Sequence, residues 1–241
     1  MEIGTQAGDP RAKTSRVPTI SSTRDVAIDF ENQFHKEIAA HSVLEPTPGE
    51  FASFPENLHP KLRSALNEQH INQLYAHQHN AFEAISANLD TVLVSHTASG
   101  KTLSFLLPIL NEYLQSASPF GVLMMYPTKA LSRDQEGILG KLLHAATEQL
   151  KLGTYDGDTP RDERNKIARV ADFVITNPDM LHAGILPNHN RRWKNFLSRL
   201  RYIVVDEVHV YRGAFGSHVA NVFRRLLRVC EIHDLSALRR R

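Results

Sequence analysis

Cysteine is almost absent from this sequence, since Cys230 is the single one among 241 residues. An internal disulfide is therefore excluded, and the composition suits a reducing compartment. No apolar run approaches the roughly 20 residues of a membrane span, and the first residues lack the apolar segment of a signal peptide. We expect a soluble intracellular protein without a membrane partner, in the cytoplasm of a bacterium or the nucleus of a eukaryote.

The sequence also has almost no excess charge. Its 28 Lys and Arg residues stand against 26 Asp and Glu residues, which leaves a net charge of +2. Bulk charge therefore gives no argument for a nucleic-acid partner, and any basic surface has to be local. Hydrophobic residues make up 41% of the chain, which is enough for one sizeable core.

The composition changes near residue 50. Residues 1–23 are rich in Thr, Ser, Pro and charge, which indicates a flexible tail. Apolar residues at successive i, i+4 steps then predict an amphipathic helix over residues 24–40, and the Pro-rich stretch 45–49 ends it. We expect residues 1–50 to form this tail and helix, and residues 51–241 to form one domain.

Short apolar runs alternate with stretches of helical periodicity from residue 91 onward. Such alternation predicts an α/β fold, with a parallel sheet flanked by helices and with its loops gathered at one edge. The expected strands are 91–94, 121–126, 152–155, 172–176 and 200–205. Helices are expected at about 60–67 and at 77–88. One helix is expected from 101 onward, and a separate one follows 127–131 and ends at about 149. Two more are expected at 159–168 and at 216–232.

The stretch 95–102 reads Ser-His-Thr-Ala-Ser-Gly-Lys-Thr and lies between an expected strand and an expected helix. Small residues let a loop curl so that its N–H groups point inward, and the helix adds its own unpaired N–H groups and dipole. Lys101 would then contact the β- and γ-phosphates, and the Thr102 hydroxyl would bind Mg²⁺. The alternative is a strand–turn–helix corner with a chance Gly-Lys-Thr. The candidate nucleotide-binding residues are Thr97, Ala98, Ser99, Gly100, Lys101 and Thr102.

A second candidate centre follows the last expected strand, where Asp206 and Glu207 are adjacent. In a parallel sheet this strand end faces the same edge as the phosphate loop, so both centres can reach one nucleotide. An Asp here can hold the Mg²⁺ that bridges the β- and γ-phosphates, and a neighbouring Glu can polarise the attacking water. The alternative is a strand end marked by charge before a turn.

Four motifs in order resemble the first motor domain of the DEAD/DEAH-box helicases. They are residues 95–102, Pro-Thr-Lys-Ala-Leu at 127–131, Thr-Asn-Pro-Asp at 176–179 and Asp-Glu-Val-His at 206–209. The connecting segments 155–160, 177–186 and 211–218 are similar to the bacterial mitomycin-repair DNA helicases and their fungal RecQ-four-like relatives. The resemblance implies a RecA-like P-loop NTPase fold and an ATP-driven DNA helicase with a role in DNA repair.

The resemblance also implies roles for single residues. Lys101 matches the phosphate contact, Asp206 the Mg²⁺ anchor and Glu207 the water-activating base. His209 matches the residue that links the nucleotide state to the nucleic acid, and Gln78 matches the adenine contact. The expected cofactors are therefore ATP and Mg²⁺. The positions that match loops contacting a sugar-phosphate backbone are Pro127, Thr128, Lys129, Thr176, Asn177 and Asp179.

In that family the chain continues into a strand with a Ser-Ala-Thr motif and a second motor domain, neither of which residues 234–241 supply. We therefore expect a domain incomplete at its C-terminal end, with little or no ATPase activity alone and with a separate chain as a candidate partner. DNA is favoured over RNA by the connecting segments alone. The alternatives are an RNA-directed helicase domain and a non-catalytic split or truncated subunit that binds nucleotide.

Two basic stretches have open interpretations. Trp193, within the run Arg-Arg-Trp-Lys at 191–194, would either stack on a base or pack inward from a solvated helix face. Arg224, Arg225 and Arg228 would either form a functional surface or a solvated face. Cys230 lies among apolar residues, and we expect it to be a core residue.

Overall fold

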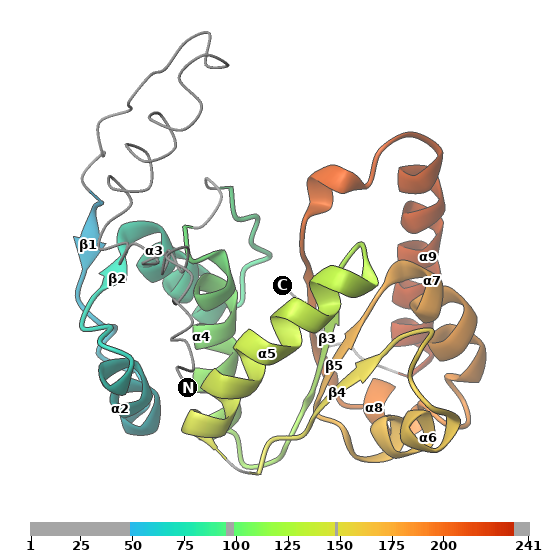
Figure 1. The fold of residues 1–241 in the computed structure, drawn as a ribbon, viewed down its shortest axis with the longest axis horizontal. Coiled ribbons are helices and arrows are strands. Elements are labelled where there is room, and N and C mark those ends of the chain that lie inside the picture. Colours follow the sequence, from blue (N-terminus) through green and yellow to red (C-terminus); the bar gives the residue numbers. More distant parts are fainter. Residues whose placement is uncertain (1–48, 95–98, 148, 234–241) are drawn as a thin grey trace, which may run out of the picture. The chain divides into compact units, whose positions relative to one another are not determined.

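The computed structural model describes residues 49–94, 99–147 and 149–233 (Figure 1). Its internal contacts divide the chain after Pro48, so every described residue belongs to the second unit, which begins at Gly49. The tail and the helix expected within residues 1–50 lie outside the described residues, as do the last eight residues. Among the described residues, no helix has the length and apolar character that crossing a membrane requires.

A parallel sheet forms the centre of the domain and confirms the predicted α/β fold. Its order is β4-β5-β3-β6, and each pair of neighbours runs in the same direction. The strands are β3 (Gly121–Met125), β4 (Leu152–Tyr155), β5 (Phe173–Thr176) and β6 (Leu200–Val205). Because all four run the same way, their C-terminal ends meet at one edge, where sites form in such sheets.

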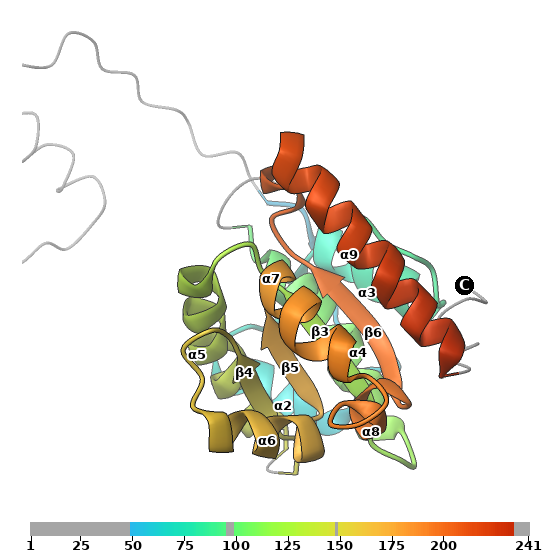
Figure 2. The same ribbon diagram turned by 90° about the vertical axis from the view of Figure 1, so that its right-hand side faces the viewer.

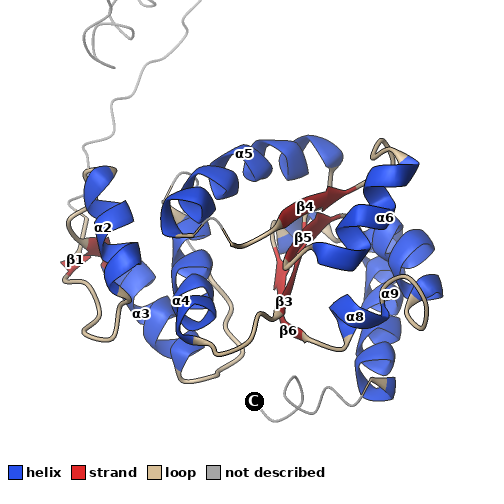
Figure 3. Ribbon diagram, turned by 90° about the horizontal axis from the view of Figure 1, so that it is seen from below, coloured by secondary structure: helices blue, strands red, loops and turns tan. Residues whose placement is uncertain are grey.

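The sheet separates two hydrophobic cores, and alternate residues of its central strands face one core or the other. Val122 and Met124 of β3 face one core, whereas Leu123 and Met125 face the other. All four are fully buried, which explains why these strands are apolar throughout rather than alternating with polar residues. Helices lie on both sides of the sheet (Figure 3).

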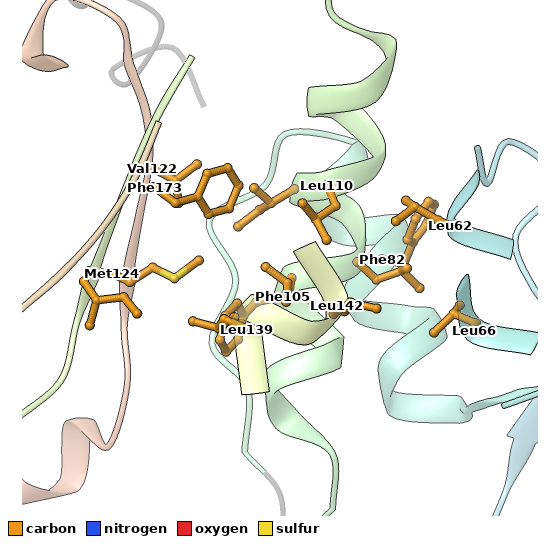
Figure 4. Packing of buried hydrophobic residues seen from close by; sticks show 14 of the residues in the cluster. Leu62, Leu66, Phe82, Phe105, Leu110, Val122, Met124, Leu139, Leu142 and Phe173 are labelled. Carbon is orange, nitrogen blue, oxygen red and sulfur yellow. The ribbon is translucent and has the colours of Figure 1, made fainter. Parts of the chain in front are cut away.

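Four helices lie on the first side of the sheet. Helices α4 (Lys101–Gln115) and α5 (Lys129–Ala146) lie next to the strands, and α2 (Pro60–Glu68) and α3 (Ala76–Ser86) pack behind them, away from the sheet (Figure 3). Helix α4 presents an apolar side to the sheet, and Leu110 lies beside Val122 and Phe173 (Figure 4). A two-stranded antiparallel pair, β1 (Phe51–Ala52) with β2 (Leu74–Tyr75), precedes α3.

The second face is covered by α6 (Arg161–Val170), α8 (Lys194–Leu197) and the long helix α9 (Gly213–Ile232), which is visible in Figure 2. Short turns connect them: α7 (Pro178–Met180), the π-helical η1 (Leu181–Ile185) and the 3-10 turns η2 (Leu186–Asn188) and η3 (Val208–Val210). Trp193 is fully buried here, with its ring edge-on to Tyr155 at 4.9 Å between centroids. The inward-packing interpretation of Trp193 is therefore confirmed, and Cys230 is a core residue as expected.

The prediction of a strand at Thr91–Val94 is wrong. This segment pairs with no strand of the described residues, and the side chains of Val92 and Val94 are 88% and 91% exposed. A β-branched run forms a strand only where a neighbour completes its hydrogen-bond ladder. The sheet ends instead at β6, and the space between β6 and Thr91–Val94 is a cavity.

Candidate functional site

The candidate site begins at the first turn of α4. Gly100 precedes this helix with a backbone φ of +75°, a left-handed conformation that a glycine adopts without strain. Lys101 is the first residue of the 15-residue helix, so its side chain lies where unpaired N–H groups and the helix dipole favour an anion. Thr97 and Ala98 lie outside the described residues.

The start of α3 holds the backbone that leads into α4. The Gln78 Nε2 group donates a hydrogen bond to the carbonyl of Gly100 at 3.1 Å, and Gln78 Oε1 accepts one from the Tyr75 N–H at 3.0 Å. The His77 Nε2 atom lies 2.9 Å from the carbonyl oxygen of Ser99. Gln78 is only 5% exposed, so these bonds are shielded from water. An adenine contact was predicted for Gln78, whereas the contact of the neighbouring His77 with this backbone was not predicted.

Thr102 faces α5. Its hydroxyl donates to Gln135 Oε1 at 3.2 Å, across 33 residues of sequence. A hydroxyl that donates in this direction keeps its lone pairs available for a cation. Gln135 carries no motif signal, and a contact across this separation is not readable from one sequence.

The acidic pair lies at the C-terminal end of β6. The Asp206 N–H donates to the Met125 carbonyl at 3.0 Å, which continues the ladder with β3. Asp206 Oδ1 accepts a bond from the N–H of Glu207 at 2.8 Å, and Glu207 itself adopts a left-handed backbone with φ of +50°. Glu207 Oε2 lies 3.0 Å from His209 Nδ1. A non-glycine residue at positive φ carries backbone strain, and such strain gathers at functional sites.

Both centres line one cavity of about 730 Å³, within the range typical of ligand pockets. The residues of both candidate centres that line it are Lys101, Asp206, Glu207 and His209. The structure therefore brings a helix N-terminus and a lysine together with two carboxylates. The helix N-terminus and the lysine suit phosphate oxygens, and the carboxylates suit Mg²⁺, so this set of groups fits a magnesium–nucleotide. Gln78 and Thr102 do not line this cavity, since they contact the backbone and α5 instead.

Two tyrosines near Asp206 were not predicted. Tyr126 directly follows β3 and is 1% exposed, and its hydroxyl has no hydrogen-bond partner among the described residues. The Tyr211 hydroxyl is likewise buried without such a partner. Burial, followed by the negative charge of Asp206, raises the pKa of Tyr126, and the same two causes raise the pKa of Tyr211 to about 12. Both phenols therefore stay protonated at neutral pH.

The candidate nucleic-acid loops follow β3 and β5 at the same sheet edge. Thr128, Lys129 and Asp179 are exposed. Thr176 is fully buried and its hydroxyl donates to the Tyr155 carbonyl at 2.8 Å, while Asn177 Oδ1 accepts from the Met180 N–H at 2.9 Å. The buried pair thus shapes its loop, and the exposed residues form its surface.

Lys129 has a partner that the motifs did not indicate. Its Nζ lies 2.8 Å from Asp158 Oδ1, and both side chains are about half exposed. Asp156 builds the turn that carries Asp158, because its buried carboxylate accepts bonds from the N–H groups of Asp158 and Thr159 at 2.8 and 2.9 Å. The turn after β4 therefore joins the edge formed by the loops after β3 and β5.

The order of the motifs along a parallel sheet, with both centres on one cavity, agrees with the comparison with known families. The profile of the DEAD/DEAH box helicases matches residues 75–237. The chain belongs to the DEAD/DEAH box helicase family. This family membership confirms the resemblance on which the residue roles were based.

Relatives of this helicase chain are found in bacteria and fungi. The ATP-dependent helicase YprA of Bacillus subtilis is 43% identical over 190 residues, which are 79% of this chain and 25% of YprA. The ATP-dependent helicase HRQ1 of Saccharomyces cerevisiae is 42% identical over 160 residues, which are 65% of this chain and 14% of HRQ1.

Solved helicase structures share the fold. The DUF1998 helicase MrfA, bound to DNA and AMPPNP, is 43% identical with a TM-score of 0.75, over 79% of this chain and 26% of MrfA. Lhr of Mycobacterium smegmatis, bound to ssDNA and AMP-PNP, is 27% identical with a TM-score of 0.63, over 72% of this chain and 23% of Lhr. The chain thus spans about a quarter or less of the length of these relatives.

Proposed function

We propose that this chain is the nucleotide-binding motor domain of an ATP-dependent DNA helicase that acts in DNA repair. The observation that supports this most directly is the shared cavity of Lys101 with Asp206 and Glu207. A motor of this kind works where DNA is, in the cytoplasm of a bacterium or the nucleus of a eukaryote.

Each residue of the cavity has a distinct proposed role. Lys101 and the N–H groups of the first turn of α4 bind the β- and γ-phosphates. Thr102 and Asp206 hold Mg²⁺, which when bound neutralises charge that develops on the transferring phosphoryl group. Glu207 accepts a proton from the attacking water. His209, whose Nδ1 lies 3.0 Å from Glu207 Oε2, couples the nucleotide state to nucleic-acid binding. Gln78 positions Gly100 and, in addition, contacts adenine.

The nucleic-acid surface of this proposal consists of the loops at the C-terminal sheet edge. Pro127, Thr128, Lys129 and Asp179 contact the sugar-phosphate backbone, and buried Thr176 and Asn177 hold their loop in shape. Contacts to the backbone carry no sequence information, which suits a translocating motor. DNA is preferred over RNA because MrfA and Lhr, both at least 27% identical, were solved with DNA or ssDNA.

A separate chain with a second motor domain is the proposed partner. The open edge of β6 and the exposed Val92 and Val94 lie on opposite sides of the cavity, so a strand entering there would gain a ladder partner in β6. The second domain would also bring an arginine finger, which contributes about a thousandfold or more to phosphoryl transfer. Alone, the chain should have little ATPase activity and no unwinding activity.

The test is binding and hydrolysis by the purified chain with single-stranded DNA and with RNA of the same sequence. We expect tighter binding to DNA and an ATPase rate that stays low until a second motor domain is added. Preference for RNA would favour the alternative of an RNA-directed helicase domain. Nucleotide binding that no second domain converts into hydrolysis would favour a non-catalytic subunit. Unwinding of a tailed duplex by the chain alone would contradict the proposed division between two domains.

A further inference from the structure

A groove lined by three arginines lies on the outer side of α9. Its volume is about 240 Å³, and it is lined by Asn221, Arg224, Arg225 and Arg228. The opposite side of the helix packs on the sheet through buried Val222, Leu226 and Val229, so packing keeps the guanidinium groups facing solvent. Among the residues that the structure describes, no carboxylate lines the groove.

These arginines differ from the arginines that hold the fold together. Arg199 pairs with buried Asp172 at 2.6 Å, and Arg201 pairs with Glu112. Within the described part of the chain, none of the three groove arginines forms an ion pair. Arg224 donates to Asn221 Oδ1 at 2.8 Å, and the other two leave most of their donors to solvent. Three adjacent cations without anionic partners repel each other, and an anion between them removes this repulsion.

The groove continues from the loop after β5. On that loop, Asp179 Oδ1 lies 3.9 Å from His218 Nε2 in the first half of α9. The ring centroids of His218 and His182 are 5.2 Å apart. His182 Nδ1 in turn contacts the guanidinium of Arg225. Because a guanidinium can only donate, His182 Nδ1 is the acceptor of this contact. These contacts link the loop after β5, through the two histidines, to the arginine groove.

We propose that this groove on α9 binds backbone phosphates of the nucleic-acid strand next to those held by the loop at Asn177–Asp179. The inference rests on the proposed function, because it extends the path of the same strand. Guanidinium groups match phosphate oxygens in a bidentate geometry, so the groove adds grip without base recognition. Arg224 and Arg228 are the residues that make the contact, and Arg225 is held in place by His182.

The experiment is a salt titration of binding, with a fluorescein-labelled single-stranded DNA and the full chain. The test variant is Arg224→Gln/Arg228→Gln, and its control is Lys166→Gln/Arg169→Gln, which removes two exposed charges from α6. The control residues lie near the end of α6 that leads into the start of β5, at the opposite sheet edge. A Lys129→Gln variant reports on the proposed backbone contact, and melting curves check that each variant folds.

Loss of two phosphate contacts should reduce the magnitude of the slope of log affinity against log salt by about 1.4. The affinity at 0.1 M salt should fall by roughly 10- to 30-fold. The control pair should retain the wild-type slope, and Arg224→Lys/Arg228→Lys should retain most of it because the charge remains. A wild-type slope in the glutamine pair, while Lys129→Gln lowers it, overturns the groove inference and leaves the proposed function standing. An acidic protein would then be the candidate ligand of the groove. A wild-type chain that binds no strand even at low salt overturns both.

Discussion

The side-chain amide of Gln78 donates to the backbone carbonyl of Gly100 over 3.1 Å, and so ties the start of α3 to the residue before α4. A Cβ added to Gly100 would lie 2.5 Å from Gln78 Nε2, so the two residues are packed against each other as well as bonded. The turn proposed to bind phosphate is thus held in place by the residue that the family resemblance associates with adenine. The same side chain, Gln78, therefore has a structural contact with Gly100 and a proposed role in nucleotide binding.

Replacement of Gln78 by Leu should lower both stability and nucleotide affinity. The change leaves the Gly100 carbonyl and the Tyr75 N–H without their buried partner, which costs about 1–3 kcal/mol of unfolding free energy. Chemical denaturation measures this loss, and Asn80→Ala on the exposed side of α3 is the matched control, with an expected change within about 0.5 kcal/mol. An unchanged unfolding free energy in Gln78→Leu would show that this bond does not hold the turn.

Glu207 offers a test that separates stability from catalysis. Its φ of +50° favours glycine and is an outlier for a β-branched residue. Glu207→Gly should therefore leave the unfolding free energy unchanged or raise it by up to about 1 kcal/mol, whereas Glu207→Val should lower it by about 1–3 kcal/mol. Both variants should abolish any ATP hydrolysis. Equal melting temperatures for the glycine and valine variants would contradict the strained backbone.

The open edge of the sheet should make the chain self-associate. Val92 and Val94 lie on the cavity beside β6 with nearly their whole side chains exposed, and an unpaired apolar edge promotes aggregation. The variant Val92→Lys/Val94→Lys should reduce association in sedimentation velocity and change the unfolding free energy by less than about 0.5 kcal/mol. A loss of several kcal/mol would mean that both side chains are packed in a strand in solution.

Cys230 should make stability depend on alkaline pH. Burial raises the pKa of this thiol to about 11, while in the unfolded chain it titrates near about 8.5. The unfolded state therefore loses the proton first, so this contribution to stability is complete below about pH 8.5 and is lost as the pH rises toward 11. Denaturation at pH 7 and at pH 9.5 should show a larger drop for the wild type than for Cys230→Ala. Equal drops in the two proteins would contradict a buried, protonated thiol.

Local patterns were sufficient for most of the fold. The strands at 152–155 and 200–205 have the predicted bounds. At 200–205 the run Ile-Val-Val directly before Asp206 is typical of a strand in a parallel sheet. Thr91–Val94 carries the same pattern but remains unpaired, since a ladder needs a neighbour that local sequence does not reveal. The local pattern predicts where a strand is able to form, but the strand forms only where a neighbouring strand is available for pairing.

The candidate site was predicted in part. The motifs predicted that Lys101 and Asp206 lie close together, and both line one cavity although the strand expected before Lys101 does not form. The contacts of Gln135 with Thr102 and of Asp158 with Lys129 join segments about 30 residues apart, and no spacing rule predicts them. Burial was equally unreadable for Trp193, because the residues that cover it, such as Tyr155, come from other elements.

The central claim is that Lys101 and Asp206 hold one magnesium–nucleotide in the cavity between them. Its most direct test is the affinity of the chain for a fluorescent ATP analogue, measured with Mg²⁺ and with EDTA, for the wild type, Lys101→Ala, Asp206→Asn and Glu207→Gln. We predict that Lys101→Ala loses binding in both conditions, that Asp206→Asn loses only the gain that Mg²⁺ gives, and that Glu207→Gln binds like the wild type. Wild-type affinity in Lys101→Ala, or an unchanged gain from Mg²⁺ in Asp206→Asn, would contradict the claim.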